Sequence, residues 1–130
     1  MGAQLPRGDV IRERTILIVE DEFLIAMDLQ LMLEARGWRV IGPVATVEEA
    51  LRLLENELPS VALLDVNLGT ELVTPVAEDL KRRGIPFALA SAYAQPELYG
   101  GAILARVPNA GKPMNERRVM AALMQLIEAY

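Results

Sequence analysis

Acidic, hydroxyl and amino side chains stand directly after the short apolar segments of this 130-residue chain. They are Glu20, Asp21, Asp65, Ser91 and Lys112. Taken singly, each residue type is more often a turn residue, a helix cap or a solvated surface residue. Taken together, gathered carboxylates repel one another unless a cation joins them, and an all-oxygen donor set favours a hard divalent ion. The set therefore predicts a Mg²⁺ site beside a carboxylate that can act as a nucleophile.

The segments that carry these residues are continuous apolar runs, as expected for parallel strands buried on both faces. The runs cover residues 15–20, 38–41, 61–65 and 86–91, and a short fifth strand is expected before residue 109. Ligands of such sheets bind beyond the carboxyl ends of the strands. The predicted site residues all lie at those ends.

Helical patterns alternate with the runs. The first spans residues 22–36, where Leu24, Met27, Leu31 and Ala35 share one narrow arc that is expected to face the core, which leaves a second stripe of Ile25, Leu29, Met32 and Leu33 facing away. Thr46 and Glu49 form a capping box for a second helix, a third runs from residue 73 to residue 84, and Asn115 can cap the last one. A short helix is expected between residues 95 and 109.

Five strands that alternate with five helices predict an α/β fold: a doubly wound, five-stranded parallel sheet of flavodoxin-like topology. One domain is expected at residues 15–130, preceded by a flexible arm at residues 1–14. The length suffices for a core without disulfide or zinc.

The composition excludes several classes of function. Cysteine and histidine are both absent, which removes thiol chemistry, imidazole bases and most zinc sites. A formal net charge of −5 argues against a nucleic-acid groove. Because no apolar run has the length of a membrane span or the features of a signal peptide, we expect a cytoplasmic protein.

The spaced motifs resemble the receiver domain of two-component response regulators. They are Ile-Leu-Ile-Val-Glu20-Asp21-Glu22, Leu-Leu-Asp65-Val-Asn67-Leu, Ser91-Ala92 and Lys112-Pro113. Three further motifs, Asn67-Leu-Gly69, Gly84-Ile-Pro86-Phe87 and Ser91-Ala92-Tyr93, resemble a subgroup called FAT GUY receivers, whose fourth strand runs from Pro-Phe into Thr-Gly-Tyr. The resemblance covers residues 15–130.

The resemblance implies a phosphoacceptor, Asp65, that takes a phosphoryl group from a sensor histidine kinase or histidine phosphotransferase. It also implies that Mg²⁺ is held by Glu20, Asp21, Asp65 and the backbone carbonyl of Asn67. Lys112 and the Ser91 hydroxyl are expected to contact the phosphoryl group, and the backbone N–H groups of Val66 and Ala92 are further donors. The chain would then be a signalling protein rather than an enzyme.

Two features bear on how such a protein would signal. Asn109 stands where receivers commonly have an aromatic residue. We therefore expect signalling to depend on Tyr93, with Ser91 and Asn109 as the other switch residues. No effector domain follows Tyr130, so we expect a stand-alone receiver that binds a partner protein or passes the phosphoryl group onward. Docking of the first helix onto a kinase and a homodimer through the last helix are further expectations.

Three alternatives stay open. A pseudo-receiver would keep the fold and bind partners without being phosphorylated. A phosphohydrolase of the haloacid-dehalogenase type needs a second acid two residues after the nucleophile, where this chain has Asn67. A flavodoxin-like cofactor carrier needs a Gly-rich or Ser/Thr-rich phosphate loop after the first strand, which this chain lacks.

Overall fold

The structure is a computed structural model that describes residues 14–129. The strands are β1 (Thr15–Val19), β2 (Arg39–Val44), β3 (Val61–Leu64) and β4 (Phe87–Leu89). The helices are α2 (Phe23–Ala35), α3 (Val47–Asn56), α4 (Thr74–Arg82), α5 (Glu97–Gly100), the 3₁₀ helix η1 (Ala102–Leu104) and α6 (Glu116–Ala129). The predicted arm lies outside the described residues, apart from Arg14. None of the described helices is long and apolar enough to cross a membrane.

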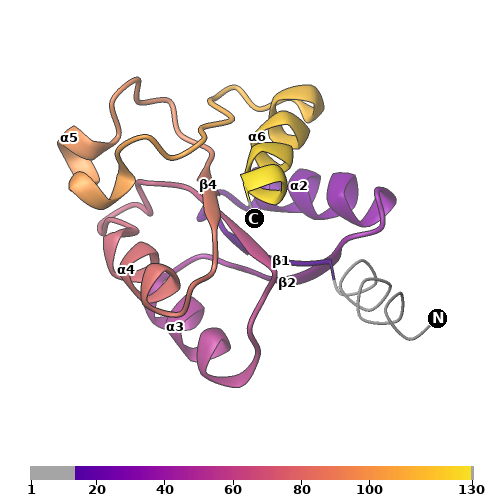
Figure 1. Ribbon diagram of the computed structural model, residues 1–130, viewed down its shortest axis with the longest axis horizontal. Coiled ribbons are helices and arrows are strands. Elements are labelled where there is room, and N and C mark those ends of the chain that lie inside the picture. The colour runs from indigo at the N-terminus through magenta and orange to yellow at the C-terminus, as the bar shows by residue number, and fades with distance from the viewer. Residues whose placement is uncertain (1–13, 130) are drawn as a thin grey trace.

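The four strands form one parallel sheet in the order β2-β1-β3-β4. Helices α2 and α6 cover one face, and α3 and α4 cover the other (Figure 1). Neighbouring residues of β1 point to opposite faces, so Ile16 and Ile18 pack in one cluster and Leu17 and Val19 in the other. The doubly wound α/β class is confirmed, and β1, which lies between β2 and β3, is buried throughout.

The predicted fifth strand is reduced to a single bridge between Leu89 and Asn109. Leu89 donates its N–H to the Pro108 carbonyl at 2.8 Å, and Ala110 donates to the Leu89 carbonyl at 2.7 Å. Gly111 then adopts a φ of +78°, which extended strand residues do not have. The prediction of five strands was wrong in this respect: the chain reaches the position of the fifth strand and leaves it after one bridge.

The predicted orientation of the first helix was also wrong. Leu24 is 73% exposed and Leu31 61%, whereas Leu29 and Leu33 of the other stripe are buried against the sheet. Met27 and Ala35 are exposed as well, and Ile25 and Met32 pack partly against the core. Helix α2 is apolar on both faces, so its periodicity does not select the buried one.

Two helix starts agree with the sequence. Thr46 Oγ1 accepts a hydrogen bond from the Glu49 N–H at 3.1 Å, and a Glu49 carboxylate oxygen accepts the Ala45 N–H at 3.1 Å. Asn115 Oδ1 accepts the Arg118 N–H at 2.9 Å at the start of α6. These caps fix where α3 and α6 begin, and with them the loops that end at the sheet's carboxyl edge.

Candidate functional site

Three carboxylates meet at the carboxyl edge of the sheet because β1 and β3 are parallel neighbours that end at the same level. Val19 pairs with Leu64, so the next residues, Glu20 and Asp65, emerge side by side. With Asp21 they form a cluster in which one carboxylate oxygen of each residue lies within 4.8 Å of the others. Glu20 and Asp65 are buried, at 2% and 7% exposure, while Asp21 is exposed to solvent.

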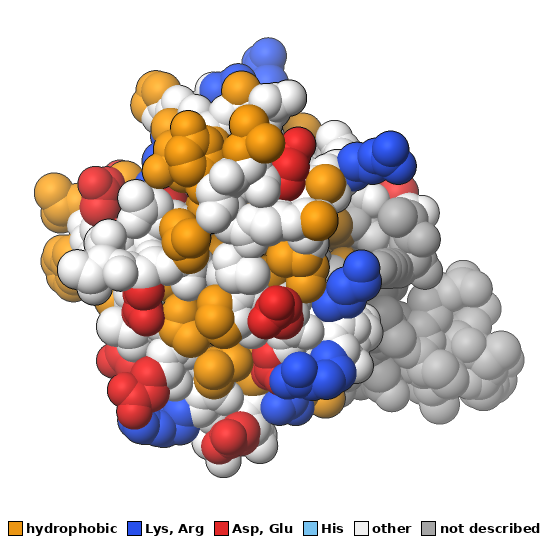
Figure 2. Space-filling view, turned by 90° about the vertical axis from the view of Figure 1, so that its left-hand side faces the viewer, with side chains coloured by type: hydrophobic (Ala, Val, Ile, Leu, Met, Phe, Trp, Pro, Cys, Tyr) orange, Lys and Arg blue, Asp and Glu red, His pale blue; other side chains and the backbone are white. Residues whose placement is uncertain are grey.

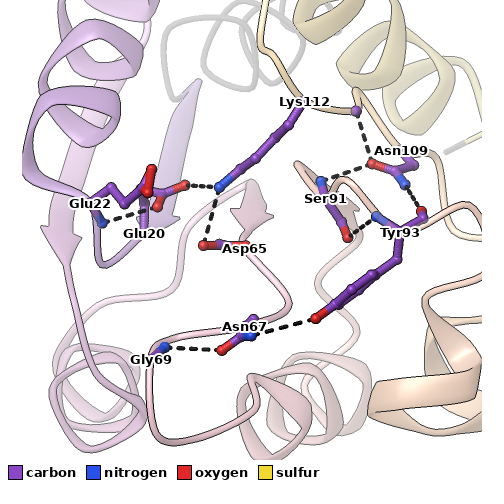
Figure 3. A network of polar contacts seen from close by, with 10 residues as sticks. Glu20, Glu22, Asp65, Asn67, Gly69, Ser91, Tyr93, Asn109 and Lys112 are labelled. Carbon is purple, nitrogen blue, oxygen red and sulfur yellow. Dashed lines mark hydrogen bonds and ion pairs between the residues drawn. The ribbon is translucent and has the colours of Figure 1, made fainter.

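Lys112 reaches into this cluster from the loop before α6. Its Nζ lies 3.3 Å from Glu20 Oε1 and 3.3 Å from Asp65 Oδ2 (Figure 3). The ammonium group thus offsets part of the repulsion between two buried carboxylates. The Glu20 carboxylate also accepts the Glu22 N–H at 3.0 Å, which holds the turn between β1 and α2.

The surroundings alter the proton affinity of both charged partners. Burial and, next, the neighbouring Glu20 carboxylate raise the pKa of Asp65 to about 7, against the opposing effect of Lys112. Burial works against the charged form of Lys112, but the carboxylates of Asp65 and Glu20 outweigh it and raise the pKa of the amine. A metal-free site therefore holds a charged lysine beside a carboxyl group that is about half protonated near pH 7.

Ser91 belongs to a second network at the end of β4. Its hydroxyl accepts the Tyr93 N–H at 3.0 Å, and its own N–H donates to Asn109 Oδ1 at 3.0 Å. Asn109 Oδ1 also accepts the Gly111 N–H at 2.9 Å, and Asn109 Nδ2 donates to the Tyr93 carbonyl at 3.2 Å. Figure 3 shows Asn109 between these three backbone segments.

Tyr93 closes the side of the site opposite Glu20. Its hydroxyl lies 3.4 Å from Asn67 Nδ2, and its ring stacks on Tyr99 with centroids 4.0 Å apart and planes at 16°. Asn67 Oδ1 accepts the Gly69 N–H at 3.0 Å, which shapes the turn after β3. The loop after β4 thus contacts both the turn after β3 and helix α5.

The two networks border one open pocket of about 340 Å³. It is lined by Asp21, Glu22, Asp65, Asn67, Gly69, Ser91, Ala92, Tyr93 and Lys112. Three predicted site residues are not among those that line it: Glu20 and Val66, which are buried, and Asn109. The pocket has the acidic, hydroxyl and amino groups needed to hold a divalent ion and an anionic group together.

Sequence reasoning missed one participant, Tyr99. Nothing in the spacing points to it, because the stack depends on how the short α5 folds back. Gly69 was part of the Asn67-Leu-Gly69 motif, and Asn-x-Gly after a strand is a turn signal in which the asparagine side chain accepts the glycine N–H. Sequence reasoning also attached no hydrogen bonds to Asn109, which has three.

The fold and the site together define a class of protein: a doubly wound α/β domain with three carboxylates and a lysine at the carboxyl edge of its sheet. The chain belongs to the response regulator receiver domain family, whose model matches residues 16–124. This agrees with the family that the sequence motifs indicated.

Curated relatives carry the same domain. The transcriptional regulatory protein PdtaR of Mycobacterium tuberculosis is 32% identical over 92 residues, which are 70% of this chain and 45% of that protein. The phyllosphere-induced regulator PhyR of Methylorubrum extorquens is 39% identical over 88 residues, which are 65% of this chain and 33% of that protein. The chain thus spans a third to about half of these relatives.

Solved structures agree. A CheY-like receiver domain protein of Methanospirillum hungatei is 28% identical, with a TM-score of 0.74 and coverage of 89% of this chain and 94% of that one. The response regulator PhyR of Brucella abortus is 32% identical, with a TM-score of 0.73 and coverage of 98% of this chain and 54% of that one.

Proposed function

We propose that the protein is a receiver that accepts a phosphoryl group on Asp65 from a phosphohistidine of a kinase or phosphotransferase. The observation that carries the proposal is the Asp65 carboxylate, held in an open pocket 3.3 Å from Lys112 and within 4.8 Å of two further carboxylates. These 130 residues contain no histidine, so the donor imidazole has to come from outside them.

In the proposed transfer, an oxygen of Asp65 attacks the phosphorus. The new O–P bond gives an acyl phosphate, while the P–N bond of the phosphohistidine breaks and the donor imidazole keeps the electron pair and takes up a proton. Lys112 is placed to hold the incoming phosphoryl oxygens by charge-assisted hydrogen bonds. The Ser91 hydroxyl and the backbone N–H groups of Val66 and Ala92 are the further donors we assign.

The donor set fits Mg²⁺, because all its groups are oxygens and three carboxylates stand together. Glu20, Asp21, Asp65 and the Asn67 carbonyl are the residues we assign to hold it. The ion would supply positive charge against the equatorial oxygens during transfer.

The phosphoryl group would then favour one arrangement of the loop after β4. When the Ser91 side chain rotates so that its hydroxyl donates to a phosphoryl oxygen, it loses the hydrogen bond that it accepts from the Tyr93 N–H at 3.0 Å. Tyr93 contacts Asn67 and Tyr99, so this change is passed to α5, whose Leu98 is 72% exposed. The outcome is a shift of population that a partner protein senses, and the protein signals rather than catalyses.

We also propose that the receiver acts on its own. An uncharacterized protein of Leptolyngbya boryana that is 34% identical over 91 residues supports this, because the match covers 69% of that protein and leaves little length for a second domain.

The test is intact mass after incubation with Mg²⁺ and acetyl phosphate, for the wild type, for Asp65→Asn and for a sample containing EDTA. We expect one phosphoryl adduct in the wild type and none in either control. An adduct that persists in Asp65→Asn would contradict the assignment of the acceptor. A wild type without adduct and without Mg²⁺ binding would instead favour a pseudo-receiver, which binds partners without phosphorylation.

A further inference from the structure

Asn109 stands where the sheet would continue into a fifth strand and does not. Leu89 has both hydrogen bonds of a regular parallel pairing, to Pro108 and from Ala110. The next rung of such a ladder would join the Ser91 N–H to the Ala110 carbonyl. Here the Ser91 N–H donates to the side chain of Asn109 instead.

The same side-chain oxygen turns the chain toward Lys112. Asn109 Oδ1 accepts the Gly111 N–H two residues on, which is the hydrogen bond of an Asx turn, and Gly111 has a φ of +78°. Lys112 follows this turn directly, and its amine lies 3.3 Å from Glu20 and from Asp65.

The amide nitrogen completes the set. Asn109 Nδ2 donates to the Tyr93 carbonyl at 3.2 Å, so one side chain joins the end of β4, the loop that follows it and the segment that carries Lys112. An aromatic residue at this position has neither an amide donor nor an acceptor in this geometry. Asn109 can therefore hydrogen-bond to backbone groups, whereas an aromatic side chain at this position would make only packing contacts.

We propose that Asn109 is a positioning residue that fixes the Ser91 hydroxyl and the Lys112 amine on the two sides of Asp65, in place of the missing strand. This rests on the proposed function, because the value of the placement is phosphoryl transfer to Asp65. Asn109 touches neither Asp65 nor the acidic cluster, so its effect passes through Ser91 and Lys112.

The first measurement needs no phosphorylation. Amide hydrogen exchange of Ser91 and Gly111 is followed by NMR in the metal-free protein. In Asn109→Ala both amides lose their acceptor, and we expect exchange at least about tenfold faster. Asn109→Asp keeps an acceptor oxygen for both amides and should stay close to the wild type.

The second measurement is the rate constant of adduct formation with acetyl phosphate and Mg²⁺. Loss of the hydrogen bonds that place Ser91 and Lys112 should slow Asn109→Ala about tenfold, and Asn109→Asp should recover most of the rate. Asn115→Ala is the matched control, because it removes a similar side-chain acceptor, that of the Arg118 N–H, just beyond Lys112. That variant should melt at a lower temperature and keep both the exchange and the rate.

Unchanged exchange in Asn109→Ala would overturn the proposal, and so would faster exchange with an unchanged rate. An equal loss of rate in Asn115→Ala would assign the effect to general loosening and would also overturn it. A wild type that forms no adduct and binds no Mg²⁺ counts against the proposed function alone, and hydrogen exchange then decides whether Asn109 holds the two segments.

Discussion

Asp65 is buried beside two charged neighbours, Glu20 and Lys112. The pKa of its carboxyl group therefore reports on the electrostatic environment of the site. The folded-state pKa of about 7 lies above the ordinary value of 3.8. The folded protein therefore keeps a proton that the unfolded chain gives up between these values. The stability that this proton contributes is complete below pH 3.8 and is lost as the pH rises through 7.

The first prediction follows for the metal-free protein. In EDTA, the free energy of unfolding of the wild type should fall between pH 5 and pH 8, because Asp65 loses its proton while it remains buried beside Glu20. Asp65→Asn removes this charge and should be the more stable protein at pH 8, by roughly 2 kcal/mol. Urea unfolding at both pH values measures it.

Glu55→Gln is the control for this experiment, since Glu55 is an exposed acid on α3, away from the site. It should follow the wild-type pH profile. A parallel fall in Asp65→Asn would mean that another group causes the pH dependence.

Among the elements, α2 presents an apolar surface that the rest of the protein leaves uncovered. Phe23 and Leu24 are each 73% exposed, and Met27 and Leu31 are 43% and 61% exposed on the same side. This face starts one turn from Asp21, beside the pocket. It is the face that we expect a phosphohistidine partner to dock on, in place of the stripe that the sequence pattern indicated.

The second prediction concerns this face. The double variant Leu24→Ala and Leu31→Ala should slow phosphoryl transfer from a phosphohistidine partner by about tenfold or more, because it removes exposed anchor side chains. Labelling by acetyl phosphate should not change. Leu58→Ala is the control, as Leu58 is 59% exposed and lies between α3 and β3. Equal slowing with both donors would show that the variant disturbs the site itself.

The third prediction concerns α3, whose start is fixed by Thr46. Thr46→Ala removes the acceptor of the Glu49 N–H and should destabilise the protein by about 1 kcal/mol, as loss of a cap does. Chemical unfolding measures the change. Thr46→Ser keeps the hydroxyl and should recover most of it; a loss as large in Thr46→Ser would point to the methyl group instead.

For the whole molecule, the architecture and the central acidic cluster were predictable because short segments of the sequence determine each of them. A buried run followed by an acid specifies both a strand and where it ends, as at Val19 and Leu64. The face of α2 was not predictable, since both sides are apolar and only the packed neighbours choose. The early end of the fifth strand was not predictable either. The Asn109 side chain competes with a backbone carbonyl for the Ser91 N–H, and the outcome depends on where Ser91 lies.

The fourth prediction is made at this scale. If the acidic cluster binds Mg²⁺, an ion concentration ten times the dissociation constant should stabilise the folded protein by about 1.4 kcal/mol, because only the folded chain gathers the three carboxylates. The melting temperature should rise by roughly 3–5 °C for a domain of this size. Calorimetry at pH 8 measures the shift, and a similar rise in Asp21→Asn would contradict binding at this cluster.

The side of the molecule that carries α4 and α5 shows hydrophobic side chains reaching the surface among acidic and basic ones (Figure 2). Leu98 and Tyr99 are 72% and 56% exposed there, and the Thr74 hydroxyl donates to the Gly100 carbonyl at 2.6 Å. Helix α5 is thus held to α4 at one end and to the loop after β4 through the Tyr93–Tyr99 stack, while its Leu98 stays exposed to solvent.

The early departure of the chain from the sheet has a consequence for association between copies. A sheet that ends in a bare strand offers its edge to other chains, which is a common route to aggregation. Strand β4 has only three residues, and Leu89 is already engaged by Pro108 and Ala110. The β4 edge therefore offers too short a stretch for another chain to pair with, so this edge of the sheet is protected from edge-to-edge growth.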